Sequence, residues 1–409
     1  MKRELLFFLV LVAALTVRAQ KVVVSGTVVD GVTGEAVAGA SVGTLTGEPR
    51  GAVGGLSVVT NGDGYFMLKS DVAVEAVTVS HVGYRSKRVA VTGQPLTVRL
   101  EPTVVQLDEV LVMADNPREL VNAAIRKIPQ NYASQPELYS CFYRETAMKR
   151  QHYITVAEGV VDMYKTEAGV RPGRDRVAIK KGRRLLSAKQ NDTLGVKVLG
   201  GPVAAVHLDI VKNPDFLLND DDLDCYDLKM EVPTMIADRL QYVVSLTPRV
   251  TTDYALYYGK LYIDQETLAF TRVELALDMA DRQKATERML VRKPLGVRFR
   301  PKELSLLVDY RQGSDGTMRL SYMRTTFRFN CDWKRRLFAT AFTACCEMAV
   351  TSTTDRDVQP IRGRDSFDQR DAFFDKVDYF RDPTFWQDYN IIEPTESLDK
   401  AVNRLLKKY

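Results

Sequence analysis

The sequence has only three histidines and five cysteines among 409 residues, and neither type is arranged as a metal site requires. No Cys-x-x-Cys pair occurs, and none of His81, His152 and His207 is followed by a glutamate at a ligand spacing. A Gly-x-Ser-x-Gly elbow, a Walker loop, a dinucleotide fingerprint and a His-Glu-x-x-His motif are also missing. We therefore expect no catalytic, cofactor-binding or metal-binding residues, no cofactor and no enzymatic activity.

The small set of cysteines leaves more than one role open. In an oxidising compartment some could pair, and an odd number leaves at least one unpaired. We expect buried small apolar residues or a structural bridge. Cys141 and His152, eleven residues apart across a predicted hairpin, keep an unrecognised hydrolase as a third functional hypothesis. The five cysteines are Cys141, Cys225, Cys331, Cys345 and Cys346.

Long apolar runs are scarce as well. Residues 5–15 form one, preceded by Lys2 and Arg3 and followed by a small-residue site at Ala19 and Gln20. This pattern is typical of a secretory signal peptide, which we assign to residues 1–19. No later stretch offers 18 consecutive apolar residues for a membrane-spanning helix. We predict an exported protein that is periplasmic or peripherally associated with the outer membrane.

The charge balance is nearly even. A net charge of +5 is small for this length and gives no case for a nucleic-acid partner. A hydrophobic content of 45% is ordinary for globular domains. Because single cores rarely grow beyond roughly 250 residues, the chain is long enough for two or three domains.

Short β-branched runs separated by glycine and asparagine fill residues 20–101. Strands at this regular spacing predict an antiparallel β-sandwich. The tetrapeptide Asn61-Gly62-Asp63-Gly64 predicts a tight turn that folds the strands before and after it back on each other, because these residues tolerate positive φ.

Four ordered motifs lie in this sandwich: residues 25–30 (SGTVVD), 33–42 (TGEAVAGASV), 60–66 (TNGDGYF) and 79–84 (VSHVGY). Together they resemble the carboxypeptidase-regulatory-like domain at the front of many exported proteins of Bacteroidetes-type bacteria. The resemblance implies a transthyretin-like fold without implying a function. Members of that family precede zinc carboxypeptidases and outer-membrane receptors. This chain lacks the zinc ligands of the first, and the remaining residues are too few for the barrel of the second.

The second region begins with a linker and helix over residues 102–136, where Asn116 caps the helix and Pro117 takes its first position. A larger antiparallel β-rich domain follows over residues 137–355. Its hairpins turn at Gln265-Glu266-Thr267 and at Gly313-Ser314-Asp315-Gly316, which predicts a curved meander. The fold class is therefore mainly β, with a few helices.

The hairpin at residues 258–268 (YGKLYIDQETL) resembles strands of the half-barrel in periplasmic lipoprotein carriers. That resemblance implies a concave apolar face able to hold an acyl chain. Alternation of apolar residues alone does not separate such a groove from an ordinary core.

Residues 170–189 are strongly basic. They form a candidate anion patch for lipid headgroups or lipopolysaccharide. The alternative is a solvated loop whose charge is offset by the acidic run at Asp220 to Asp222 and Asp224. The candidate patch residues are Arg171, Arg174, Arg176, Lys180, Lys181, Arg183 and Arg184.

The C-terminal segment, residues 356–409, is rich in aromatics and ends in an amphipathic helix. We expect its aromatics to cover a sheet face. Residues 385–394 (FWQDYNIIEP) resemble the ending of uncharacterised Bacteroidetes proteins with the same front domain. The helix places Leu398, Ala401, Val402 and Leu405 on one side.

The absence of a reactive constellation favours a non-catalytic exported protein. Its expected partner is an envelope protein, a glycan or a lipid at the outer membrane, reached through a tethered β-sandwich and a β-rich domain. The main alternative is a lipid-carrier-like half-barrel that holds an acyl chain.

Overall fold

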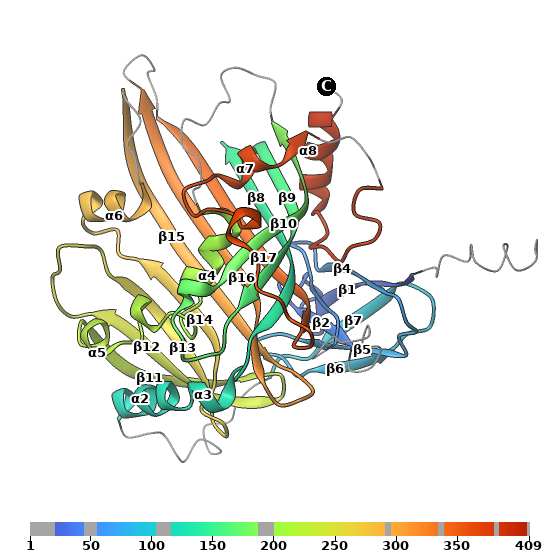
Figure 1. Ribbon diagram of the computed structural model, residues 1–409, viewed down its shortest axis with the longest axis horizontal. Helices are drawn as coiled ribbons and strands as arrows, with labels where there is room; N and C mark the ends of the chain where they lie inside the picture. The colour runs from blue at the N-terminus through green and yellow to red at the C-terminus, as the bar shows by residue number, and fades with distance from the viewer. Residues whose placement is uncertain are drawn as a thin grey trace, which may run out of the picture.

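The computed structural model describes residues 21–44, 55–103, 116–186, 200–290, 296–333, 339–379 and 384–406. The predicted signal peptide and its cleavage site lie outside these residues. Three sheets make up the fold, and the largest has eleven strands (Figure 1). The chain is mainly β, as the sequence predicts.

The front domain is a β-sandwich whose two sheets enclose a core of small β-branched and aromatic side chains, including Val28, Val42 and Phe66. Its strand β1 pairs antiparallel with β4 and parallel with β7, so the sandwich is mixed and not purely antiparallel as expected. One sheet contains β4 (Tyr65–Ser70), β1 (Val22–Asp30) and β7 (Leu96–Leu100), and the other contains β3 (Ser57–Val59), β2 (Ser41–Thr44), β5 (Ala76–Ser80) and β6 (Lys87–Ala90).

The turn at Asn61 does not join two paired strands, which corrects the sequence-based expectation. Strand β3 before it and strand β4 after it belong to different sheets. The Asn61 side chain accepts hydrogen bonds from the backbone of Asp63 and Tyr65, at 2.9 Å each, and Gly64 has a φ of 73°. These residues make a tight reversal, but the apolar faces of the strands decide which sheet each one joins.

The large sheet is a meander that begins at β11 and ends at β10 and β18. Its neighbours pair antiparallel except for the short parallel pair of β10 and β18. The two predicted hairpins form with the expected turns. In sheet order the strands are β11 (Tyr226–Ile236), β12 (Arg239–Pro248), β13 (Tyr257–Asp264), β14 (Phe270–Leu277), β15 (Val297–Gln312), β16 (Met318–Trp333), β17 (Thr340–Thr354), β8 (Glu137–Lys149), β9 (His152–Lys165), β10 (Arg176–Leu186) and β18 (Asp378–Tyr379).

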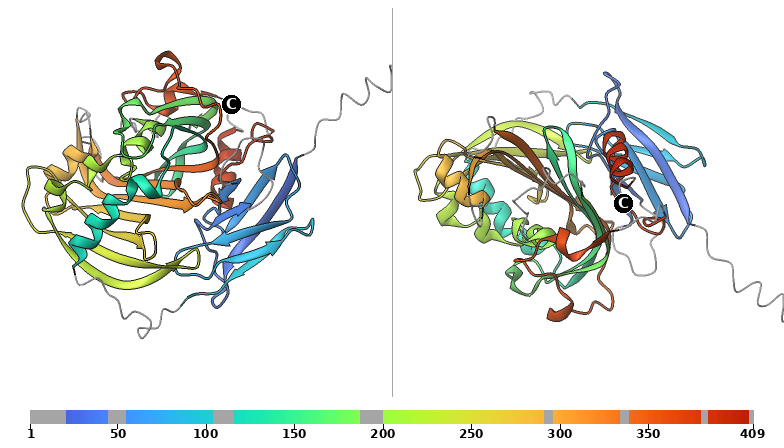
Figure 2. Two further views of the ribbon diagram at one scale, coloured as in Figure 1. Left: turned by 60° about the horizontal axis from the view of Figure 1, so that its bottom comes forward. Right: turned by 90° about the horizontal axis from the view of Figure 1, so that it is seen from above.

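The sheet curves into a half-barrel, which Figure 2 shows from two sides. Its strands β15 and β16 are each 16 residues long, and their pairing shifts register at Pro301 and at Asp309. Bulges of this kind increase local twist and bend a long strand. The sheet therefore has one concave face, which holds most helices, and one convex face, against which the front sandwich packs (Figure 2).

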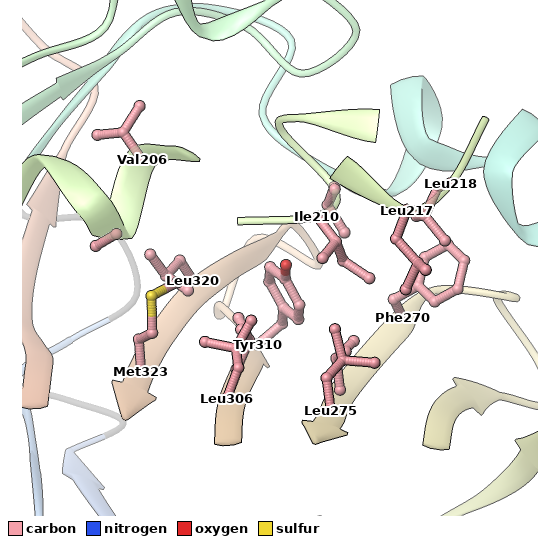
Figure 3. Packing of buried hydrophobic residues seen from close by; sticks show 14 of the residues in the cluster. Val206, Ile210, Leu217, Leu218, Phe270, Leu275, Leu306, Tyr310, Leu320 and Met323 are labelled. Atoms are coloured by element: carbon pink, nitrogen blue, oxygen red, sulfur yellow. The ribbon is translucent and has the colours of Figure 1, made fainter. Parts of the chain in front are cut away.

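The concave face carries the main core (Figure 3). Helix α2 starts as predicted, with Pro117 at its first turn and the Asn116 side chain accepting from two backbone amides. Ile210 and Leu217, on the segment after α4, pack over Tyr310 of the sheet (Figure 3). The helices are α2 (Pro117–Arg126), α3 (Ile128–Asn131), α4 (Ala204–Leu208), α5 (Asp220–Leu223), α6 (Arg282–Met289), α7 (Phe373–Lys376) and α8 (Glu396–Leu406).

The convex face is covered by the C-terminal segment and the front sandwich. Phe385 and Trp386 pack against Phe142 of the sheet and join the same cluster as Val59 of the sandwich. The Asn390 side chain accepts from the Lys69 backbone at 2.7 Å and donates back to its carbonyl at 3.0 Å. The sandwich is thus packed on the sheet and not merely tethered to it.

The terminal helix α8 buries the predicted face. Leu398, Val402 and Leu405 meet Val156 and Leu185 on the convex side of β9 and β10. The aromatics divide between the two faces, because Phe373 packs in the concave core while Trp386 packs on the convex side.

Candidate functional site

An open pocket of about 410 Å³ lies on the concave face, between α4 and strands β8, β16 and β17. Its walls are mostly apolar: Leu208 from α4, Met323 and Phe327 from β16, and Met348 from β17. Side chains two positions apart on a strand point to the same face, which brings Met323 and Phe327 together. The pocket is a gap in the concave core that the described side chains do not fill.

The roof of the pocket is built from small residues. Gly201, Ala204 and Ala205 lie where α4 crosses the sheet. Gly201 has a φ of 41°, and a Cβ there would come within 3.0 to 3.1 Å of Phe373 and Phe367. Small side chains at these positions keep the roof close to the sheet without closing the space beneath it.

A buried ionic cluster fixes the segment that carries this roof. The Asp209 carboxylate accepts a hydrogen bond from Lys165 Nζ at 2.5 Å and one from the Tyr310 hydroxyl at 2.7 Å. Lys212 Nζ donates to Thr166 Oγ1 at 2.7 Å and to the carbonyls of Glu167 and Val170. Burial lowers the pKa of Lys212 despite the neighbouring carboxylates. These contacts tie the end of α4 to strands β9 and β15.

Beside the pocket the concave face carries a buried carboxyl group on β8. Glu145 of β8 accepts a hydrogen bond from the Tyr143 hydroxyl at 2.7 Å and lies opposite Cys346 of β17. Tyr143 and Cys346 both line the pocket. Burial raises the pKa of Glu145 to about 7; the Tyr143 hydrogen bond opposes this shift and Asp375 of α7 adds to it.

Sequence reasoning missed Glu145, although a signal was present. Tyr139, Cys141 and Tyr143 mark one face of β8 as buried, and Glu145 is the next residue in the same phase. A charged residue in register with an apolar face is rare unless it has a role or a partner.

Above the pocket, buried apolar side chains continue toward the far end of the half-barrel. Phe299, Phe329 and Phe342 form a buried aromatic cluster, with ring centroids of successive pairs 4.9 and 5.7 Å apart. Phe327 contacts both this cluster and the main core. Phe327 therefore links the pocket wall to this buried aromatic cluster.

A second, larger cavity of about 780 Å³ lies between the front sandwich and the convex face of the sheet. Its charged walls pair with each other: Arg239 donates to both oxygens of Asp264, at 2.6 and 2.5 Å, and Arg272 donates to Asp309 at 3.0 Å. Burial, reinforced by Arg272, lowers the pKa of His81 on the sandwich side. These pairs join the strands beneath the interface.

The predicted anion-patch residues do not share one surface. Residues 176–186 form strand β10, which corrects the expectation of a loop. Lys181 Nζ donates to the Phe385 carbonyl at 2.7 Å and lies over its ring, and Arg183 Nε donates to Glu158 at 2.8 Å. Lys181 therefore holds the C-terminal segment on the convex face, and Arg183 adds contacts over the rings of Phe385 and Trp386.

The other members of the set have separate partners. Arg184 donates to the Phe374 carbonyl at 2.7 Å, and Lys180 pairs with Asp162 at 2.9 Å. Arg176 donates to the carbonyls of Gly173 and Asp175, Arg171 pairs with Asp215 at 3.3 Å, and Arg174 is exposed. An anion-binding role for this set stays a prediction.

The acidic run does not balance the basic segment as expected. Asp220 and Asp224 pair with Arg118 at the start of α2, at 3.0 and 2.8 Å. These ion pairs hold α5 against α2. The acidic run therefore faces a neighbouring helix and not β10.

The proposed pairing of Cys141 with His152 is wrong. Cys141 lies opposite Val161, whereas His152 lies opposite Lys149 at the tip of the β8–β9 hairpin. Eight residues of extended strand separate the two positions, or about 26 Å at 3.3 Å per residue. Cys141 is also fully buried, and burial raises its thiol pKa.

All five cysteines are free thiols, so the expected structural bridge is absent. Cys141 and Cys331 are buried, as the other interpretation predicts. Among the described residues, no three histidine, cysteine or acidic side chains are grouped as metal ligands. No helix in the described ranges has both the length and the apolar character to cross a membrane.

The front sandwich can now be assigned. Residues 24–112 match the family model of the CarboxypepD_reg-like domain. The four sequence motifs are confirmed as marks of this domain, while the Bacteroidetes origin stays untested. A comparison with curated proteins gives no match.

Solved structures resemble the larger domain. A DUF1329 family protein from Desulfovibrio piger is 13% identical, and the match covers 60% of this chain and 96% of that protein with a TM-score of 0.24. A LolA superfamily protein from Nitrosomonas europaea is 11% identical over 58% of this chain and 94% of its own, with a TM-score of 0.22.

A third structure is described as an outer membrane lipoprotein-sorting protein domain from Vibrio parahaemolyticus. It is 10% identical, and the match covers 60% of this chain and 95% of that domain with a TM-score of 0.27.

Proposed function

We propose that this protein is a non-catalytic envelope protein that binds the acyl chain of a lipid or lipid-modified molecule on its concave sheet face. The observation that carries the proposal is the open, mostly apolar pocket beneath α4, whose Phe327 side chain is backed by the buried aromatic cluster. Each methylene buried in such a space contributes about 0.8 kcal/mol. Full burial of ten or so methylenes would therefore favour binding by about 8 kcal/mol, against which the entropy cost of association is set.

Two further observations support the envelope setting and the absence of catalysis. The signal peptide predicted over residues 1–19 is expected to direct the chain out of the cytoplasm. The nucleophile and base considered from the sequence, Cys141 and His152, lie at opposite ends of one hairpin. Docking to an envelope protein or glycan is the alternative function, and it is favoured if the purified protein carries and binds no lipid.

The test is mass spectrometry of lipids that copurify with the mature protein, together with displacement of a fluorescent fatty-acid probe. Ala204→Leu adds bulk to the pocket roof and should weaken probe binding at least tenfold. Ala276→Leu makes the same change at an exposed position on β14, facing away from the concave core, and should leave binding unchanged. Equal binding by both variants, or no binding by the wild type, contradicts the proposal.

A further inference from the structure

The pocket has a polar side as well as an apolar one. Tyr143, Thr325 and Cys346 line one wall, and they come from three adjacent strands. Glu145 lies directly behind this wall, hydrogen-bonded to Tyr143 and opposite Cys346. Glu145 is buried, with 9% of its residue surface exposed, and its two neighbours Tyr143 and Cys346 lie between it and the pocket.

The charges around Glu145 favour a cationic neighbour. Burial is the main cause that raises the pKa of Glu145, and the negative charge of Asp375 of α7 adds to it. Arg184 of β10 also lies near α7, but its guanidinium group is held over the rings of Phe374 and Tyr379. Among the described residues, the Glu145 carboxylate accepts a hydrogen bond from the Tyr143 hydroxyl, and Glu145 pairs across the strands with Cys346 of β17.

We propose that the pocket selects an acyl or alkyl chain whose polar end is a primary amine or another cationic hydrogen-bond donor, and that Glu145 binds this end. This inference rests on the proposed function and names its ligand class. A carboxylate at the end of an apolar site strongly favours a paired cation, because an unpaired buried charge is costly. The apolar chain then lies along Met323, Phe327 and Met348.

The decisive experiment compares three twelve-carbon probes below their micelle concentrations: dodecylamine, dodecanol and dodecanoate. With the wild type at pH 8.5, dodecylamine should bind at least tenfold more tightly than dodecanoate. Glu145→Gln should weaken dodecylamine about tenfold and leave dodecanol unchanged. Glu303→Gln, which removes a carboxylate paired with Arg328 away from the pocket, should change none of the three.

A pH series gives a second measurement on the unmodified protein. As pH rises from 6 to 8.5, Glu145 ionises and dodecylamine affinity should increase, whereas Glu145→Gln should show no such increase. If all three probes bind equally and Glu145→Gln changes nothing, this inference is wrong and the acyl-binding function stands. If none of the three binds, the proposed function and the inference both fall.

Discussion

Two buried glutamates show how one residue type takes opposite roles in the same sheet. Burial would raise the pKa of Glu158, but Arg144 and Arg183 lower it to about 2. Both guanidinium groups and the Trp386 indole donate to this carboxylate. Glu145 has no such cations among its described contacts, and its pKa rises to about 7. Glu158 therefore stays ionised and holds its partners in place, whereas Glu145 changes its charge near neutral pH.

The raised pKa of Glu145 predicts a pH-dependent stability difference. The unfolded chain releases this proton near pH 4.5 and the folded chain near pH 7, so the folded state loses stability as pH rises between these values. Glu145→Gln should therefore be more stable than the wild type at pH 8, by up to about 3 kcal/mol, and nearly equal at pH 5. Urea unfolding at both pH values measures this, and an equal difference at both refutes it.

Helix α4 is too short to be stable alone, because isolated helices need about 12 residues or more. It depends on the contacts of Asp209, which follows it directly. Lys165 and Tyr310 bind that carboxylate from two different strands. The pocket roof is thus positioned by side-chain chemistry and not by helix propensity.

Asp209→Ala should destabilise the protein by about 3–5 kcal/mol, because it leaves the buried Lys165 ammonium without its partner. Asp215→Ala removes the exposed partner of Arg171 in the same segment and should cost less than about 1 kcal/mol. Urea denaturation compares the two variants. Similar losses for both would show that the buried pair does not fix α4.

The sequence predicted elements well where local chemistry determines them. Helix α2 follows from Asn116 and Pro117, and the hairpin turns follow from their glycine and polar residues. The predicted pairing of the strands on either side of Asn61 was wrong, because local residues specify a reversal but not the sheet that each strand joins. The pocket was beyond prediction, since it depends on how a segment of the chain crosses a sheet built from distant strands.

Trp386 connects the front sandwich to the large sheet. It packs edge-on against Phe142 with centroids 5.6 Å apart and donates to Glu158 at 3.1 Å. Its cluster also contains Val59 of the front sandwich. The two units should therefore unfold in a single cooperative transition in the wild type.

Trp386→Ala should lower stability by about 3–5 kcal/mol and separate calorimetric unfolding into two transitions. Tyr258→Ala removes a side chain that is 44% exposed and should change stability by less than about 0.5 kcal/mol. A single transition for Trp386→Ala, with unchanged midpoint, would show that the C-terminal segment does not couple the units.

The position of the C-terminal segment between the sandwich and the sheet constrains the order of assembly. Asn390 holds Lys69 and Pro394 holds Asn61, although more than 300 residues separate the partners along the chain. The sandwich can form its own core without these contacts, but it can settle on the sheet only after the C-terminal segment has joined them. A truncated product would thus expose a hydrophobic seam that quality-control proteases can recognise.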